Sequence, residues 1–124
     1  MTVPKHLKYT SEHEWLDVSG ETATVGVTEH AAELLGDVVF VDLPEAGDTV
    51  DGGEVCGEIE STKSVSDLYA PADGEVTGVN EEVVTDPALL NADPYGKGWL
   101  FTMKITGETE LLDAAAYEAL TEGN

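Results

Sequence analysis

The chain of 124 residues is long enough to bury one hydrophobic core and too short for two, so we expect a single domain over residues 1–124. A formal net charge of -21, from 26 acidic and 5 basic residues, excludes electrostatic attraction to nucleic acid or to anionic membranes. The apolar fraction of 41% and the charged fraction of 25% are typical of a folded protein and exclude a disordered one.

Short strand-like runs separated by Gly, Pro, Asp and Asn predict a mainly β domain. Thr28 can cap a short helix that begins at Glu29, and Gly36 can end it in a left-handed conformation, with Leu34 and Leu35 facing inward. The predicted strands span residues 23–28, 38–43, 54–61, 65–70, 75–79 and 99–105. Strands this short can share one core in a two-layer sandwich or a flattened barrel.

The clearest strand is 99–105, in which apolar side chains at the odd positions alternate with Leu100, Thr102 and Lys104. This period of two predicts one buried face and one partly solvent-exposed face. After it, Asp113 precedes the helix-forming residues 114–120, which predicts a C-terminal helix that packs Tyr117 and Leu120 on the sheet.

The segment ESTKSVSD, residues 60–67, joins two predicted strands and places Lys63 near a hairpin tip. A long side chain at such a tip can extend away from the protein surface. On position alone, a solvated surface lysine is the commoner explanation, because loop tips frequently carry lysine. The turn also lacks Asn-Gly or any Gly, so its local sequence does not specify a hairpin strongly.

Other candidate sites are weak. His13 lies between Glu12 and Glu14, but neighbours on a strand point in different directions, and His6 and His30 lack a paired ligand spacing, so we expect no metal site. The lone Cys56 is more typical of a small core residue than of a nucleophile. No apolar run has the length of a signal peptide or a membrane span, which favours the cytoplasm.

The acidic residues are scattered along the whole chain, and no arginine accompanies them. A partner with a basic docking surface is one explanation. The other is adaptation to the salty cytoplasm of a halophilic prokaryote, where molar salt shortens the screening length to roughly 3 Å and weakens repulsion between carboxylates. We favour the second, because the acidic residues are scattered instead of gathered in one block.

Eight motifs occur in order and together resemble the H-protein family of the glycine cleavage system, over about residues 7–120. They are EHEW at 12–15, GVTEHA at 26–31, LGDVVFVDLP at 35–44, ESTKSVSD at 60–67, AP at 70–71, GEV at 74–76, NADPY at 91–95 and GWLF at 98–101. The resemblance implies a barrel-sandwich hybrid, the fold of lipoyl and biotinyl carriers, with short helices and a C-terminal helix.

The resemblance also implies a non-catalytic lipoyl carrier, with lipoate in amide linkage on Lys63. Such a carrier takes an aminomethyl group from the pyridoxal phosphate-dependent glycine decarboxylase to the tetrahydrofolate-dependent aminomethyltransferase. It then delivers reducing equivalents to the FAD enzyme dihydrolipoyl dehydrogenase, and a lipoate ligase or lipoyltransferase attaches its arm.

Further site residues follow from the same resemblance. The positions that match the family's arm cleft include Glu14 and Asp67, whose carboxylates could pair with the protonated amine of the cargo. Glu60 and Asp67 match the acids that the ligase recognises. Thr62 departs from the family, which usually has Val before the lysine, but it keeps a branched shape, so we expect recognition to survive.

Three alternatives remain. A biotin carrier would place the lysine between two methionines, whereas Lys63 lies between Thr62 and Ser64. An H-like protein could keep the lipoyl arm and donate lipoate to other enzymes or serve another redox pathway; Glu14 and Asp67 favour the aminomethyl task. An unmodified binding module would use the acidic surface alone.

Overall fold

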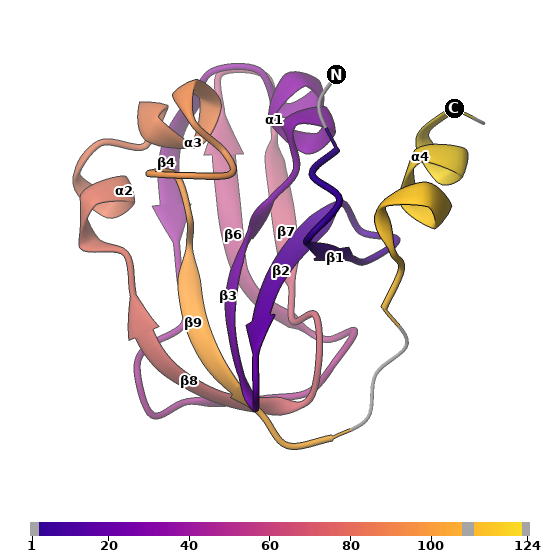
Figure 1. The fold of residues 1–124 in the computed structure, drawn as a ribbon. Coiled ribbons are helices and arrows are strands. Elements are labelled where there is room, and N and C mark those ends of the chain that lie inside the picture. The colour runs from indigo at the N-terminus through magenta and orange to yellow at the C-terminus, as the bar shows by residue number, and fades with distance from the viewer. Residues whose placement is uncertain (1–2, 108–110, 123–124) are drawn as a thin grey trace.

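The computed structural model describes residues 3–107 and 111–122, which form two antiparallel β-sheets with short helices around them (Figure 1). A six-stranded sheet has the order β1-β2-β3-β9-β8-β5, and a three-stranded sheet has the order β4-β6-β7. The strands are β1 (Lys8–Tyr9), β2 (Glu14–Ser19), β3 (Thr22–Val27), β4 (Val38–Asp42), β5 (Thr49–Val50), β6 (Val55–Ser61), β7 (Val65–Tyr69), β8 (Gly74–Val79) and β9 (Phe101–Ile105). The helices are α1 (Glu29–Leu35), α2 (Glu81–Thr85), α3 (Ala88–Ala92) and α4 (Ala114–Glu122). The predicted mainly β fold is confirmed.

The main core lies between the two sheets. Val25 and Phe101 from the larger sheet and Ile59 and Leu68 from the smaller one belong to one cluster of buried apolar residues. A second cluster joins the N-terminal segment to α4 and consists of Leu7, Tyr9, Trp15, Ala114 and Tyr117. Helix α4 is therefore held at the margin of the large sheet, beside β1 (Figure 1).

The predicted helix at residue 29 is α1. The Thr28 side chain accepts a hydrogen bond from the Ala31 N–H at 3.2 Å, and Gly36 ends the helix with φ 78°. Leu35 is buried as predicted. Leu34 is 63% exposed, so the prediction that it faces inward was wrong. Consecutive residues on a helix point about 100° apart, and here Leu35 points into the core while Leu34 points away from it.

The C-terminal helix is also present, with Tyr117 fully buried. Leu120 is 36% exposed, which contradicts its predicted burial on the sheet. The reason is that α4 packs on β1, an outer strand of two residues, which covers only the turn of the helix that carries Tyr117.

The other predicted strands are present, within about a residue of their expected ends, except that β9 begins at Phe101 instead of residue 99. Leu100, assigned to the solvent-exposed face, is fully buried and belongs to the main core cluster. It lies in the segment before the strand, where its N–H donates to Val25 O at 2.8 Å. β1, β2, β5, α2 and α3 were not among the predicted elements. Four of these five elements have two or five residues, too few for a periodic pattern to appear.

Candidate functional site

Lys63 lies at the tip of the hairpin formed by β6 and β7, where Glu60 pairs with Val65 in antiparallel register. The Ser61 N–H donates to Ser64 O at 2.8 Å, and Ser61 Oγ accepts from the backbone N–H groups of Lys63 and Ser64, each at 3.2 Å. The serine hydroxyl thus satisfies the turn amides, a role for which serine is well suited. These hydrogen bonds hold the turn in place, although it contains no glycine.

The hairpin tip rests on the end of α1. The Thr62 N–H donates to Asp37 O at 3.0 Å, and the Lys63 stem lies over Gly36, where an added Cβ would be 3.2 Å from Lys63 Cε. Gly36 has φ 78° and ψ -158°, a conformation that is almost restricted to glycine. Lys63 is exposed and forms no ion pair with any residue that the structure describes. Its amine is accessible from solvent.

Next to this hairpin is a cleft of about 160 Å³. Its walls come from the segment before β2, the end of β3, helix α1 and the β6–β7 hairpin. The lining residues are Glu12, His13, Glu14, Val27, Ala31, Leu34, Leu35, Ile59, Ser66, Asp67 and Leu68. The two residues that the sequence associates with an arm cleft, Glu14 and Asp67, therefore line the same cavity, one buried and the other exposed. Glu60 is exposed on β6 and does not line it.

Glu14 is a buried carboxyl group, 2% exposed. One oxygen accepts a hydrogen bond from the Thr10 hydroxyl and the other from the Tyr69 N–H, both at 3.1 Å. Burial raises its pKa to about 8; the two hydrogen bonds oppose the shift, and the nearby Glu12 charge adds to it. At neutral pH the carboxyl group is therefore mostly neutral, and a cation that enters the cleft would favour its ionised form.

The rim of the cleft carries a contact that sequence analysis missed. The rings of His13 and His30 are 4.7 Å apart, and His13 Nδ1 is 2.7 Å from the hydroxyl of Tyr117 on α4. The Tyr117 hydroxyl is also 2.7 Å from Thr28 Oγ1, so the C-terminal helix contacts both the cleft rim and the N-cap of α1. No sequence signal links these residues, since His13 and Tyr117 are 104 positions apart.

Other chemistry is poorly supported. Within residues 3–107 and 111–122, no group of three or more His, Cys, Asp or Glu side chains could hold a metal ion. Cys56 is half-buried, and burial raises the pKa of its thiol to about 12, with a further contribution from Glu14. A thiol that stays protonated is a poor nucleophile. None of the helices in the described parts of the chain is long and apolar enough to cross a bilayer.

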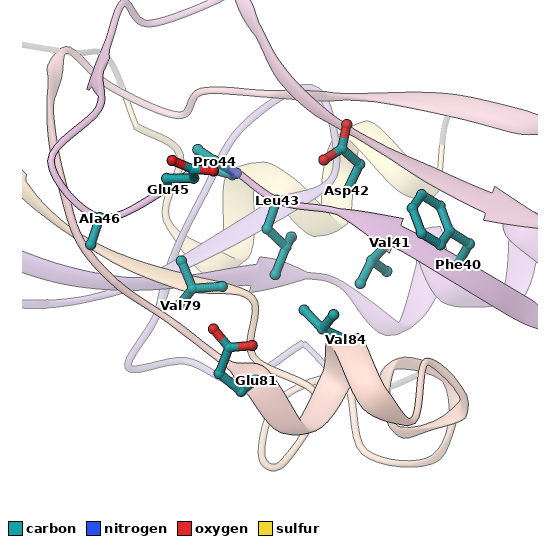
Figure 2. Close-up of a pocket in the computed structure, with 10 residues that line it drawn as sticks. All are labelled: Phe40, Val41, Asp42, Leu43, Pro44, Glu45, Ala46, Val79, Glu81 and Val84. Carbon is teal, nitrogen blue, oxygen red and sulfur yellow. The ribbon is translucent and has the colours of Figure 1, made fainter.

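A larger groove of about 540 Å³ lies between β4 and α2 (Figure 2). Phe40, Leu43 and Val84 contribute apolar surface to it, and the carboxylates of Asp42 and Glu81 are among its lining groups. Part of the 35–44 motif lines the groove, but none of the residues predicted for the arm, its cleft or ligase recognition does. The larger size of this groove therefore does not make it the chemical site. The smaller cleft, lined by both strands of the Lys63 hairpin, is the better candidate.

Comparisons with known proteins all find the same family. The family model described as glycine cleavage H-protein matches residues 7–124. The glycine cleavage system H protein of Beutenbergia cavernae is 60% identical over 123 residues, covering 99% of each chain. That of Streptomyces coelicolor is 59% identical over 121 residues, covering 96% of this chain and 97% of the relative. A crystal structure of a glycine cleavage system H protein from Mycobacterium marinum superposes with a TM-score of 0.92 at 48% identity, covering 98% of this chain and 100% of that chain.

Proposed function

The chain belongs to the glycine cleavage H-protein family and is a lipoyl carrier of the glycine cleavage system, and we propose that Lys63 is the residue that bears the lipoyl group. The observation that carries the proposal is the position of Lys63, which is exposed at the tip of a fixed hairpin whose two strands line the cleft. Residues 1–124 then form one lipoyl-carrier domain, of which residues 1–2, 108–110 and 123–124 lie outside the described structure.

The residues around Lys63 fit an attached arm. The turn is held by Ser61 and by the Thr62 contact with Asp37, so the arm would start from a defined point. Gly36 leaves room for the lysine stem, which a Cβ would crowd. When bound, the lipoyl group supplies a disulfide that opens to accept the aminomethyl group and two electrons. Because the protein tethers the arm, the arm can reach each enzyme and its cargo is present there at a high local concentration.

The cleft residues supply shelter for the cargo. Ala31, Leu34 and Leu35 of α1 offer apolar surface that excludes water, and Glu14 and Asp67 provide carboxylates for the cationic amine. Glu14 is the stronger partner of the two, because its buried position leaves little water to screen the pair. While no cation is present in the cleft, the raised pKa keeps Glu14 neutral, and the protein does not have to bury an unpaired charge.

Glu60 and Asp67 are the acids that a lipoate ligase or lipoyltransferase would recognise. Both are exposed and lie on the two strands that lead to Lys63. Thr62 is also exposed, so its hydroxyl stays solvated and imposes no desolvation cost on recognition.

The carrier itself catalyses no step. Its partners are glycine decarboxylase, the aminomethyltransferase and dihydrolipoyl dehydrogenase, and the system works in the cytoplasm. The acidic surface reflects adaptation to high salt: among the described residues the one ion pair is Lys104–Glu21 at 3.9 Å, so basic side chains balance few of the carboxylates.

Peptide mass spectrometry of the protein from its native host tests the attachment site. A lipoyl-sized mass increase on Lys63 is expected, with none in a Lys63→Arg variant and with the increase retained in Lys97→Arg, which alters another exposed lysine. An unmodified Lys63 in cells that lipoylate other proteins would contradict the proposal. The binding-module alternative would then be favoured.

The lifetime of the cargo on the carrier tests the cleft. Glu14→Gln should shorten it, because glutamine keeps the shape and the hydrogen bonds but cannot carry the negative charge. Asp17→Asn, an exposed change on the same strand, is the control. Equal hydrolysis rates for Glu14→Gln and the parent protein would remove the proposed role of Glu14.

A further inference from the structure

The hydroxyl of Tyr117 connects the C-terminal helix to the cleft through two short contacts. It lies 2.7 Å from His13 Nδ1 at the cleft rim and 2.7 Å from Thr28 Oγ1, the N-cap of α1. Tyr117 and Thr28 are both fully buried, so water does not compete with these hydrogen bonds. His13 has φ 67°, an uncommon backbone conformation for a non-glycine residue, which its surroundings must hold in place.

The donors and acceptors of this group fix the direction of its hydrogen bonds. Thr28 Oγ1 accepts from the Ala31 N–H, and its other partner among the described residues is the Tyr117 hydroxyl. The hydrogen of the Thr28 hydroxyl must therefore point to the Tyr117 oxygen, because a buried hydroxyl rarely leaves its hydrogen unpaired. Tyr117 then donates its own hydrogen to His13 Nδ1. This arrangement requires an unprotonated Nδ1, with the single ring hydrogen on Nε2.

We propose that Tyr117 is a positioning residue of the carrier, which holds His13 at the cleft rim as a neutral imidazole in its Nε2–H tautomer. Protonation of His13 would put a hydrogen on Nδ1, opposite the hydrogen that Tyr117 donates. The Tyr117 hydroxyl would then have to turn, and either its own hydrogen or that of Thr28 would lose its acceptor. The contact between α4 and the cleft thus stabilises the uncharged ring.

The charge of His13 matters because the cleft receives a cationic cargo under the proposed function, on which this inference rests. An imidazolium in the lining would repel a protonated amine and would compete for the carboxylates of Glu14 and Asp67. The groups that face His13 are His30 from α1, Tyr117 from α4 and Glu12 from its own turn, besides those two carboxylates. Burial and His30 lower the pKa of His13, and Glu12 opposes them. The tyrosine hydrogen bond acts in the same direction as burial.

Nitrogen-15 NMR of the unlipoylated protein tests the tautomer directly. We expect an unprotonated Nδ1 on His13 across neutral pH. In Tyr117→Phe we expect a mixture of tautomers and a pKa of His13 above its value in the parent protein. Tyr9→Phe is the matched control, because Tyr9 stacks on Tyr117 with ring centroids 4.7 Å apart, whereas its own hydroxyl bonds to Pro4 O. It should leave His13 unchanged.

The lipoylated proteins then test the consequence. The lifetime of the aminomethyl cargo should fall on acidification in every variant, and the fall should begin at a higher pH in Tyr117→Phe than in the parent protein or Tyr9→Phe. A purely structural defect would shorten the lifetime equally at all pH values, which would overturn the inference.

A protonated Nδ1 in the parent protein would also overturn the inference, even if Tyr117→Phe did not fold. The same holds if the titration of His13 is identical in Tyr117→Phe and the parent protein. The NMR measurement needs no lipoyl group, so an unmodified Lys63 would refute the proposed function and leave the tautomer result standing.

Discussion

Replacement of Glu14 by Gln should stabilise the fold at neutral and alkaline pH while it impairs the carrier. In the folded protein burial raises the pKa of Glu14 to about 8, whereas the ordinary value, which applies to the unfolded chain, is 4.5. Below the lower value both states hold the proton, so the carboxyl group does not oppose folding. As the pH rises from 4.5 to about 8, the unfolded chain releases the proton first, and the free energy of unfolding falls. Above about 8 the loss is complete.

The size of the effect follows from the same two values. At about 1.4 kcal/mol for each tenfold change in proton affinity, the gap between 4.5 and about 8 sets an upper limit of about 5 kcal/mol. Relaxation of the cleft and entry of water around the ionised group reduce the penalty, and we expect at least about 2 kcal/mol. Glutamine avoids the penalty, because its carbonyl can accept from the Tyr69 N–H and its amide can donate to the Thr10 hydroxyl.

Urea unfolding of the unlipoylated proteins at a series of pH values, at one fixed salt concentration, measures this difference. The stability advantage of Glu14→Gln over the parent protein should be small in acid, grow with pH and level off in weak alkali. Asp17→Asn reports the general effect of removing one negative charge, since Asp17 is exposed on the same strand. A difference between Glu14→Gln and the parent protein that does not change with pH would refute the argument.

Four further predictions concern the surroundings of the cleft and the surface. Gly36→Ala should lower the free energy of unfolding by about 1–3 kcal/mol, measured by chemical denaturation, because φ 78° with ψ -158° strains any side chain; the idea fails if alanine is neutral. Ser61→Ala should cost about 1–2 kcal/mol and slow lipoylation by a ligase in vitro, since the amides of Lys63 and Ser64 lose their acceptor. An unchanged rate would show that the turn needs no such support. Cys56 should react with iodoacetamide far more slowly in the folded protein than in urea, because its pKa is raised to about 12; equal rates would contradict its burial. The thermal midpoint should rise from low to molar salt, and equal stability at both would count against high-salt adaptation.

Local features of the fold could be predicted from the sequence. Thr28 and Gly36 mark the two ends of α1 correctly, because capping depends on residues a few positions apart. Most of the longer strands were predicted within about a residue of their ends, although β2 was missed and β9 begins two residues later than expected. The error at Leu34 comes from the angle between consecutive residues on a helix, whereas the errors at Leu100 and Leu120 depend on which neighbouring segment covers the residue.

The site could be predicted from the sequence only where it depends on residues a few positions apart. The position of Lys63 follows from two strands and the turn between them, while the shared cleft of Glu14 and Asp67 followed from family resemblance alone. The burial of Glu14 and the contact of His13 with Tyr117 had no signal in the sequence. Both arise from packing between segments far apart in the chain, which local pattern cannot specify.

The arrangement of the strands also has a consequence for self-association. The large sheet ends in β1 and β5, each of two residues, and such short outer strands offer few unpaired backbone groups to another chain. The small sheet ends in β4 and β7, which carry Asp42 and Asp67, so a second copy that approached edge to edge would bring like charges together. Concentrated solutions should therefore resist the intermolecular strand pairing that leads to fibrils. A protein that must leave each enzyme before it visits the next benefits from edges that do not adhere.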